Sequence, residues 1–452
     1  MAVTLHAATI TVTNTNDSGA GSLRAAIQVA NDGDTIDATG VSGTILLTSG
    51  QLYINPSVTI IGPGAGNLAV NGNATFRVFH NEGSNTTISG LTITNGVSEN
   101  GLGGGGILNH GGLTVIDTSI VNNDGGDDGG GIYSTFGALP QTLTVMNSTI
   151  SNNVPGGIEV CCAYETLTVM NSTISNNVSD SSMGGVYIHG VGPLTLTVTN
   201  STISGNQNSF GGGGIAAGDA TVTVTNSTIS GNTGGCAGGG IYANETQLTV
   251  KNSTISGNSS PQGVCSPGSG LGGGIYSIGF NGTLTVTDST ISDNSATAAA
   301  GGIWNGHQVT SLIVKNSTFN GNSAPTGGTI WNNGGGTVQM GNTILNAGAS
   351  GGTIESVGPF TSLGYNLASD DGGGVLTSPG DQINTNPMLG PLQDNGGPTF
   401  THALLHGSPA INAGDPNFTP PPSHDQRGPG FPRVFRGRID IGSFEVQRHR
   451  TP

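Results

Sequence analysis

The sequence predicts an all-β protein, a right-handed parallel β-helix with three sheets in a solenoid, an N-terminal helical cap and a C-terminal cap domain. Three observations predict it. Gly accounts for 81 of 452 residues, while only 8% of residues are charged. A segment of 11 residues recurs through the middle of the chain, and a Gly-Gly-Ile motif alternates with it. Repeated segments of this kind are typical of solenoids, and the regularly spaced Ile, Val and Leu residues within them exclude a disordered chain.

The recurring segment is Leu-Thr-Val-Met-Asn-Ser-Thr-Ile-Ser-Asn-Asn at Leu143–Asn153. It returns with small changes at six later positions: Leu167, Leu196, Val222, Leu248, Leu284 and Leu312. Its alternation of apolar and polar residues is that of a half-buried strand. One such unit cannot bury its apolar face alone, but units stacked about 4.8 Å apart build a continuous core. We therefore expect Leu143, Val145 and Ile150 to point inward.

The second motif places a hydrophobic residue after the glycines in ten units: Ile107, Ile132, Ile158, Val186, Ile215, Ile241, Ile275, Ile303, Ile330 and Ile354. The Gly-rich stretches before this residue vary in length, which predicts loops. A further column of Asn or Asp includes Asp117, Asn147 and Asn171. Side chains of this column that hydrogen bond from coil to coil explain the recurrence without a glycan.

The repeat divides the chain into three parts. Residues 1–60 form an N-terminal cap and the first strands; within them Gly21–Asn31 has apolar residues at helical spacing, with Ser22 placed to cap the helix. Residues 61–350 hold the β-helix repeats. In residues 351–452 the repeat fades and Pro and Arg become frequent, which predicts a cap domain packed on the last coil. Such caps cover sheet edges that would otherwise pair with other chains.

The charge balance excludes several partners. The formal net charge is −16, from 26 acidic and 10 basic residues. Such a surface repels phosphate and anionic lipid, so we expect no nucleic-acid partner. No apolar run is long enough to cross a bilayer, so we expect no membrane insertion. Residues 1–8 are too few and too polar for a signal peptide, and no anchor segment ends the sequence.

Three sets of residues resemble one family of bacterial surface proteins. The start, Gly21-Ser-Leu-Arg-Ala-Ala-Ile, resembles the CSLREA-type start, although Gly21 stands where Cys is expected and Ala25 where Glu is expected. The repeats resemble those of polymorphic outer-membrane proteins and pectate-lyase-like β-helices. The C-terminal motifs are similar to choice-of-anchor Q domains: Pro387–Pro398, Gly407–Asp415, Asp425–Gly428 and Asp440–Glu445.

This resemblance implies a right-handed parallel β-helix exported from a bacterial cell and therefore extracellular or displayed at the cell surface. It implies no activity, because fold and function separate easily in solenoids of this kind.

An aromatic column is the sharpest functional feature. The residue after each Gly-Gly-Ile hydrophobe should point outward, since alternate side chains of a strand face opposite ways. Six of these residues are aromatic: Tyr133, Tyr187, Tyr242, Tyr276, Trp304 and Trp331. A ladder of flat amphipathic rings can stack on sugar rings, and rings that stack on each other for stability alone are the alternative. We therefore expect a polysaccharide or cell-surface glycan as partner.

A polysaccharide hydrolase or lyase is the alternative function. Hydrolysis needs two carboxylates that face one groove, and the candidates are Asp127, Asp128 and Asp180. Elimination from a uronate needs a cation, and between Arg77 and Arg427 the chain offers only Lys251 and Lys315. The leading expectation is a secreted or surface-displayed protein that binds glycan or mediates adhesion, rather than an enzyme.

The candidate metal ligands and the cysteines give little further information about function. No cofactor is expected, although Ca²⁺ could bind the loop carboxylates Asp124, Asp127 and Asp128. Cys236 and Cys265 occupy the same loop of neighbouring coils, so a disulfide between them is plausible. Cys161 and Cys162 are adjacent and can only form a vicinal bridge or stay free. Columns of outward Thr resemble ice-binding solenoids, but the irregular coil lengths argue against a flat ice-binding face.

Overall fold

The computed structural model is an all-β parallel β-solenoid of about 13 turns with three main sheets, which confirms the predicted fold class. It describes residues 7–135, 141–162, 165–180, 184–263, 265–266, 268–306, 311–435 and 437–447. The chain forms two compact units: unit 1 (residues 1–197 and 206–208) and unit 2 (residues 198–205 and 209–452). Among the described residues, no helix is long and apolar enough to cross a bilayer.

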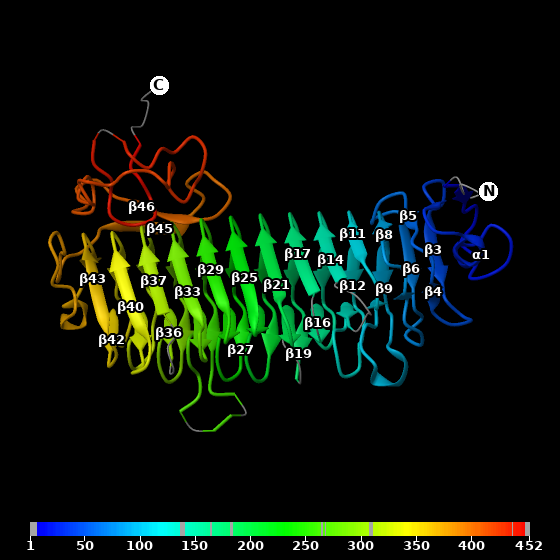
Figure 1. The fold of residues 1–452 in the computed structure, drawn as a ribbon, viewed down its shortest axis with the longest axis horizontal. Coiled ribbons are helices and arrows are strands. Elements are labelled where there is room, and N and C mark those ends of the chain that lie inside the picture. The colour runs from blue at the N-terminus through cyan, green and yellow to red at the C-terminus, as the bar shows by residue number, and fades with distance from the viewer. Residues whose placement is uncertain are drawn as a thin grey trace. The chain divides into compact units, whose positions relative to one another are not determined.

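In unit 1 each coil supplies one strand to each sheet (Figure 1). Sheet 1 contains β1 (Thr9–Thr11), β2 (Thr35–Asp37), β5 (Thr59–Ile61), β8 (Thr86–Ser89), β11 (Leu113–Ile116), β14 (Gln141–Met146) and β17 (Glu165–Met170). Sheet 2 contains β4 (Leu52–Ile54), β7 (Phe79–Asn81), β10 (Ile107–Asn109), β13 (Ile132–Ser134), β16 (Ile158–Cys162) and β20 (Val186–Gly190). Sheet 3 contains β3 (Gly43–Leu46), β6 (Leu68–Asn71), β9 (Thr92–Thr94), β12 (Ser119–Val121), β15 (Thr149–Ser151) and β18 (Thr173–Ser175). A short pair is formed by β19 (Val178–Ser179) and β23 (Gln207–Asn208), and η1 (Glu99–Gly101) is a single 3₁₀ turn.

The predicted inward columns are confirmed in unit 1. Leu143 pairs in register with Leu167 and Val145 with Val169, and all four side chains are fully buried. The Gly-Gly-Ile hydrophobes of this unit are buried in the same way. Alternation along short strands therefore predicted the interior residue by residue, since the side-chain period of a strand is two.

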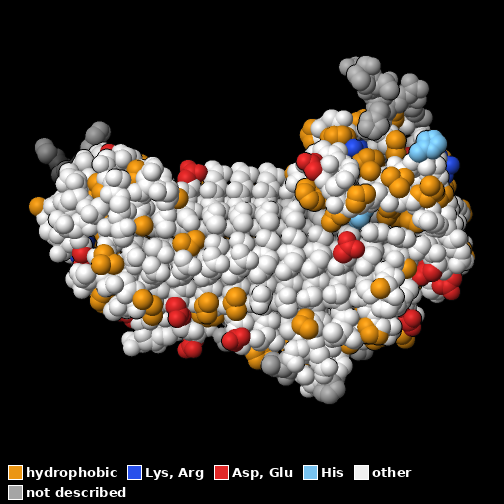
Figure 2. Space-filling view, turned by 180° about the vertical axis from the view of Figure 1, so that it is seen from behind, with side chains coloured by type: hydrophobic (Ala, Val, Ile, Leu, Met, Phe, Trp, Pro, Cys, Tyr) orange, Lys and Arg blue, Asp and Glu red, His pale blue; other side chains and the backbone are white. Residues whose placement is uncertain are grey.

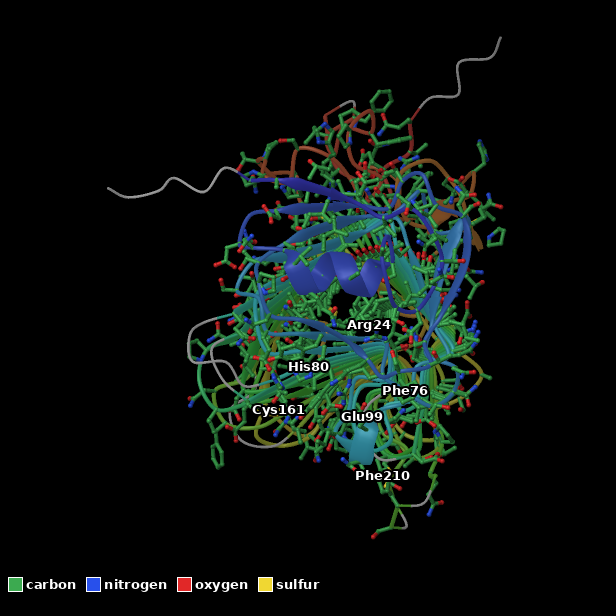
Figure 3. All side chains as sticks on the ribbon, turned by 90° about the vertical axis from the view of Figure 1, so that its right-hand side faces the viewer. Arg24, Phe76, His80, Glu99, Cys161 and Phe210 are labelled. Carbon is green, nitrogen blue, oxygen red and sulfur yellow. A yellow bond between two sulfur atoms is a disulfide. The ribbon has the colours of Figure 1, made fainter. Side chains whose placement is uncertain are left out.

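The N-terminal helix is α1 (Leu23–Val29), and it lies across the end of the first coil, as Figure 3 shows. The Ser22 side chain caps it by accepting a hydrogen bond from the Ala25 N–H (3.1 Å), as predicted. Leu23 is buried beneath the helix. On the other side, the Arg24 guanidinium pairs with Asp17 (2.6 Å) and donates to the Gln51 carbonyl (2.7 Å), which fastens the helix to the strands.

The Asn ladder exists, but in a different column from the one expected. Asn147 has a φ of 49°, so this column makes the left-handed turns between strands. Some of its side chains do hydrogen bond from coil to coil, as Asn171 Nδ2 does to Asn147 Oδ1 (3.3 Å) and Asn342 Nδ2 to Asn316 Oδ1 (3.1 Å). The buried ladder lies six residues later, where Asn153 Nδ2 donates to Asn177 Oδ1 (3.0 Å) and Asn123 Nδ2 to Asn153 Oδ1 (3.0 Å). In unit 1 the side chains of the turn column face solvent, whereas amide groups in the interior need partners from the next coil.

Unit 2 repeats the three-sheet pattern. Sheet 1 contains β25 (Ala220–Thr225), β29 (Gln247–Lys251), β33 (Thr283–Thr287), β37 (Ser311–Lys315), β40 (Thr337–Gly341) and β43 (Phe360–Gly364). Sheet 2 contains β24 (Ile215–Gly218), β28 (Ile241–Asn244), β32 (Ile275–Ile278), β36 (Ile303–Asn305), β39 (Ile330–Asn332) and β42 (Ile354–Ser356). Sheet 3 contains β22 (Thr202–Ser204), β26 (Thr228–Ser230), β30 (Thr254–Ser256), β34 (Thr290–Ser292), β38 (Thr318–Asn320), β41 (Ile344–Asn346) and β44 (Leu367–Ala368). A short sheet is formed by β27 (Thr233–Gly234), β31 (Ser259–Ser260) and β35 (Ser295–Ala296), and η2 (Gly372–Gly374) is a 3₁₀ turn. β21 (Leu194–Thr199) includes the boundary between the two units.

The C-terminal segment of unit 2 lies along the side of several coils rather than only on the last one (Figure 1). Its strands β45 (Leu389–Gln393) and β46 (Thr401–Leu404) pair antiparallel. The Thr254 hydroxyl of β30 donates to the Phe400 carbonyl (2.6 Å), and His402 contacts the Ser292 hydroxyl of β34 (2.9 Å). The segment therefore does not pack only on the last coil, contrary to the prediction from the sequence. The outer Thr and Ser side chains of sheet 3 supply polar partners for it along several coils. Figure 2 shows hydrophobic side chains gathered on its outer surface.

Candidate functional site

A Glu–His pair lies on the outer face of sheet 2 in unit 1. Glu159 of β16 and His189 of β20 point to the same side, and His189 Nε2 lies 3.1 Å from Glu159 Oε1. The Gly129 N–H donates to the other oxygen, Oε2 (3.0 Å). The Tyr187 ring stacks on the imidazole with centroids 4.0 Å apart and planes within 13°. The carboxylate is almost fully buried, whereas the imidazole is about one-third exposed, so the pair presents a fixed, accessible His189.

Asp128 completes what we name the acid–His group: Asp128, Glu159 and His189. It comes from the loop between β12 and β13 and is half-buried. Burial raises the pKa of the Asp128 carboxyl, and the negative charges of Glu159 and Asp127 raise it further, against a smaller opposing effect of His189. The group thus combines an acid that keeps its proton to higher pH with a hydrogen-bonded carboxylate and an imidazole. Carboxyl groups with such different surroundings are typical of acid–base catalysis.

Tyr133 of β13 borders the acid–His group. Burial raises the pKa of its phenol; a hydrogen bond to Thr135 opposes the shift, while the charges of Asp128 and Glu159 add to it. The phenol therefore stays a hydrogen-bond donor across the neutral range. Its ring packs directly against Gly103, where an added Cβ would overlap the ring and come within 3.1 Å of the Asp128 Cβ. A glycine at 103 is thus needed for both side chains to take these positions.

Arg77 holds the loop on which this packing depends. Its guanidinium is buried and donates to the carbonyls of Gly103 and Gly104, both at 3.0 Å. A buried Arg that binds carbonyl oxygens fixes backbone position, since its planar fork allows few geometries. Arg77 is therefore a positioning residue for Gly103 and, through it, for Tyr133 and Asp128.

The sequence predicted part of this group. Asp127 is exposed and acts on Asp128 through its charge, while Asp124 Oδ1 accepts the Gly126 N–H (2.9 Å). Asp180 lies exposed directly after β19. It is not among the charged groups that shift the pKa of Asp128. The sequence placed Glu159 between the loops of Asp128 and Asp180 without assigning it a role, and it gave no role to His189. One sequence signal could have identified them: Glu159 occupies the same outward position as Tyr187, and Tyr187 lies two residues before His189.

The predicted aromatic column is split between the units. Tyr133 and Tyr187 border the acid–His group in unit 1. Unit 2 supplies the other four rings: Tyr242, Tyr276, Trp304 and Trp331. Consecutive ring centroids lie 5.4, 6.0 and 4.2 Å apart. Trp304 is only 6% exposed, because Ala299 and Ala300 pack against it, and burial raises the pKa of Tyr276 to about 12. Tyr242, Tyr276 and Trp304 stack face to face, whereas Trp331 meets Trp304 edge to face. Glycan binding by the column stays a prediction.

Both cysteine pairs are disulfides. Cys236 and Cys265 are joined across neighbouring coils of unit 2, with Cα atoms 5.8 Å apart. Cys161 and Cys162 form a vicinal bridge at the end of β16, with Cα atoms 3.7 Å apart. The vicinal bridge lies in the same outward register as His189, since Cys161 pairs with it.

The two Lys residues of the repeats meet in a cleft of unit 2 rather than in the acid–His group. Lys251 and Lys315 line a cavity of about 460 Å³ together with Tyr365 and Phe418. Asp288 also lines it, and burial raises the pKa of this carboxyl to about 6, partly offset by Arg433. The cleft offers cations beside two acids, of which Asp288 is almost fully buried and Asp415 is partly exposed.

Comparison with known proteins supports the fold. A family model described as a right handed beta helix region matches residues 168–347. Pectate lyase Pel9A is 14% identical, with 98% of both chains covered and a TM-score of 0.45. The Agl-KA catalytic domain is 17% identical over 75% of this chain and 64% of that chain, with a TM-score of 0.52. Alginate lyase AlyF-OU02, solved in complex with G6, is 12% identical over 85% and 88%, with a TM-score of 0.43.

A search of curated proteins found no match. The chain is thus a right-handed β-helix, as its sheets and the matching family model show. The resemblance to choice-of-anchor Q and CSLREA-type surface proteins stays a prediction.

Proposed function

We propose that this right-handed β-helix cleaves a polysaccharide, with Asp128, Glu159 and His189 as its acid–base residues. One observation carries the proposal: a carboxyl whose pKa is raised by burial and by neighbouring carboxylates lies beside a Glu–His pair. This replaces adhesion as the leading function, because the acid–His group offers chemistry that binding does not require.

The roles follow from the hydrogen bonds. Glu159 Oε1 accepts the proton on His189 Nε2, so the other ring nitrogen, Nδ1, carries the lone pair and can take a proton from water. That water attacks the anomeric carbon while the glycosidic C–O bond breaks. Protonated Asp128 gives its proton to the departing oxygen. Acid and base of this kind each contribute about 10²–10⁴-fold to the rate.

The charge of the site favours a neutral polysaccharide. Asp127, Asp128 and Glu159 place carboxyl groups together, and a uronate chain would be repelled by them. Tyr133 and Tyr187 flank the group and offer ring faces of the kind on which sugars stack. The two disulfides support export to an oxidising compartment, where polysaccharides are met.

Asp128→Asn tests the proposal. Against a panel of neutral and uronate polysaccharides, we expect the wild type to release reducing ends from a neutral polymer. Asp128→Asn should lower this turnover about 10²–10⁴-fold, because the amide has no proton to give. The matched control is Asp219→Asn, the same change at an exposed turn residue of unit 2. Equal turnover in both variants, or no turnover on any polymer, would contradict the proposal.

The pH profile gives a second check. Since Asp128 must be protonated to act as acid, turnover should fall as pH rises through its pKa. The raised pKa places this limb above the range of an ordinary Asp. Asp127→Asn removes one of the charges that raises it, so the limb should shift to lower pH, as kcat/KM measured against pH will show. An unshifted limb would mean that another group donates the proton.

Glycan binding without cleavage is the second proposed function. It rests on the row of four neighbouring rings in unit 2, of which Trp331 is partly exposed at the end of the row. We expect Trp331→Ala to lose binding on a glycan array while Asp128→Asn keeps it. Array binding that survives Trp331→Ala would remove the ring column from consideration.

A further inference from the structure

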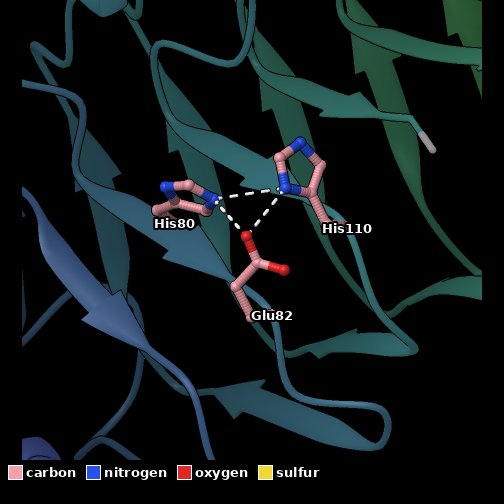
Figure 4. A group of neighbouring side chains, drawn as sticks. All are labelled: His80, Glu82 and His110. Atoms are coloured by element: carbon pink, nitrogen blue, oxygen red, sulfur yellow. Dashed lines mark hydrogen bonds and ion pairs between the residues drawn. The ribbon is translucent and has the colours of Figure 1, made fainter. Parts of the chain in front are cut away.

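Three potential metal ligands converge on one point of sheet 2 in unit 1 (Figure 4). His80 Nε2 lies 3.0 Å from Glu82 Oε1 and 3.3 Å from His110 Nδ1, and His110 Nδ1 lies 2.9 Å from the same Glu82 oxygen. A tetrahedral zinc ion with bonds of about 2.0–2.1 Å to nitrogen separates its ligand atoms by about 3.3 Å. The triangle therefore already has nearly the size that such an ion requires.

The strands fix this convergence. His80 lies in the middle of β7 and Glu82 two residues later, so both side chains face outward. In the next coil, the His110 N–H donates to the Asn81 carbonyl (2.8 Å), which places His110 beside Glu82. The buried Asn81 and Asn109 side chains hydrogen bond beneath them (2.8 Å). Ligands on rigid strands need little rearrangement to bind an ion.

Protons alone satisfy the three atoms poorly. If both imidazoles donate to the Glu82 oxygen, their two N–H groups face each other across 3.3 Å. If one imidazole instead accepts a hydrogen bond from the other, the accepting nitrogen carries a lone pair that also faces the Glu82 carboxylate. That nitrogen and the Glu82 oxygen then lie about a hydrogen-bond length apart with no proton between them. One cation that binds all three atoms removes both conflicts.

We propose that His80, Glu82 and His110 form a binding site for a zinc-class transition-metal ion. Two imidazole nitrogens and one carboxylate oxygen suit Zn²⁺ better than Ca²⁺ or Mg²⁺, which take oxygen ligands. The side chains are 16%, 32% and 27% exposed, so a fourth position stays open to water or a ligand. A cleft of about 590 Å³ lined by Gln51 and Tyr53 adjoins the site, since both residues contact His80. The proposal is independent of the acid–His group.

Gln51 controls the tautomer of His80. Its Oε1 accepts from Arg77 (2.9 Å), and since Arg only donates, the amide nitrogen must face His80 Nδ1 (3.3 Å). Metal binding through Nε2 needs the proton on Nδ1, so the Gln51 side chain has to move away from Nδ1, because turning the amide in place would bring its NH₂ group against the Arg77 guanidinium. A Glu at 51 would offer one oxygen to Arg77 and the other to the Nδ1 proton. Carboxylates in this position strengthen metal sites about 10–100-fold.

The test is calorimetric titration of the full chain with ZnCl₂, paired with Co²⁺ absorption spectroscopy. We expect one Zn²⁺ per chain and the intense visible bands of four-coordinate Co²⁺. Glu82→Gln and His110→Ala should each weaken binding at least about tenfold. Gln51→Glu should tighten it about tenfold. His406→Ala, at an exposed His, is the matched control and should bind as the wild type does.

Circular dichroism melting separates loss of ligands from loss of fold, and Glu82→Gln is nearly isosteric, so it keeps the strand packing. Absence of stoichiometric zinc binding in the wild type would overturn the proposal, as would equal affinity in folded Glu82→Gln and His110→Ala. Weaker or unchanged binding in Gln51→Glu would overturn coordination through His80 Nε2.

Discussion

Asn258→Ala is expected to lower the free energy of unfolding of unit 2 by about 4 kcal/mol. Asn258 is fully buried in the Asn ladder, where its Nδ2 donates to the Ile229 carbonyl and to Asn294 Oδ1, both at 2.9 Å. Its Oδ1 accepts from the backbone N–H (3.0 Å) and the side-chain Nδ2 (2.9 Å) of Asn232. Alanine removes all four hydrogen bonds from the interior, and each buried polar group that loses its partner costs about 1–3 kcal/mol. Denaturant unfolding monitored by circular dichroism measures the loss.

Asn252→Gly is the matched control for this prediction. Asn252 belongs to the turn column of the same coil and has a φ of 48°. Glycine adopts that conformation without strain, so the free energy of unfolding should change by less than about 1 kcal/mol. A loss of similar size in both variants would mean that any Asn of the repeat contributes alike. The specific contribution of the buried ladder would then be disproved.

Glu445→Gln is expected to reduce the pH dependence of stability in unit 2 between pH 5 and pH 8. Burial, together with the negative charge of the neighbouring Asp440, raises the pKa of the Glu445 carboxyl from 4.5 to about 8. Between these values the folded chain holds a proton that the unfolded chain has released, so stability falls as pH rises from about 4.5 to 8. Each pKa unit corresponds to about 1.4 kcal/mol, so the fall amounts to a few kcal/mol.

The test compares the free energy of unfolding of the wild type and of Glu445→Gln at pH 5 and at pH 8. The side-chain amide oxygen that Glu445→Gln introduces can still accept from the Asp440 N–H, which Glu445 Oε2 accepts at 2.9 Å, so packing is kept. The variant should therefore match the wild type at pH 5 and exceed it at pH 8. Glu355→Gln, at an exposed Glu, should leave the pH dependence unchanged. A wild-type chain equally stable at both pH values would contradict the burial of an uncharged Glu445.

The acid–His group and the proposed metal site lie on the outer face of one sheet in unit 1. His80, Glu159 and Tyr187 occupy outward positions of β7, β16 and β20 in a common register. Neighbouring coils of a parallel sheet repeat about every 4.8 Å. A sheet face of this kind can present successive side chains to an extended chain. The two experiments are separable, because zinc titration needs no substrate and turnover is lost in Asp128→Asn without any change at His80.

Some of the candidate site could be predicted from sequence. The Gly-Gly-Ile alignment already placed Glu159 and Tyr187 in the same outward column. It could not place Asp128, because its loop varies in length and its position depends on Gly103 and Arg77. The convergence of His110 on Glu82 also depends on the register between coils, which the degenerate early repeats do not define.

The sequence by itself determined the solenoid: the inward Leu, Val and Ile files, the helix capped by Ser22 and the glycine-rich loops. These follow from local rules, since a period of two fixes which side of a strand is buried. Only the tertiary structure decided which Asn column became the ladder, where the segment after residue 386 lies and which acids meet His189. Those outcomes depend on contacts between coils and on loops whose path no local pattern encodes.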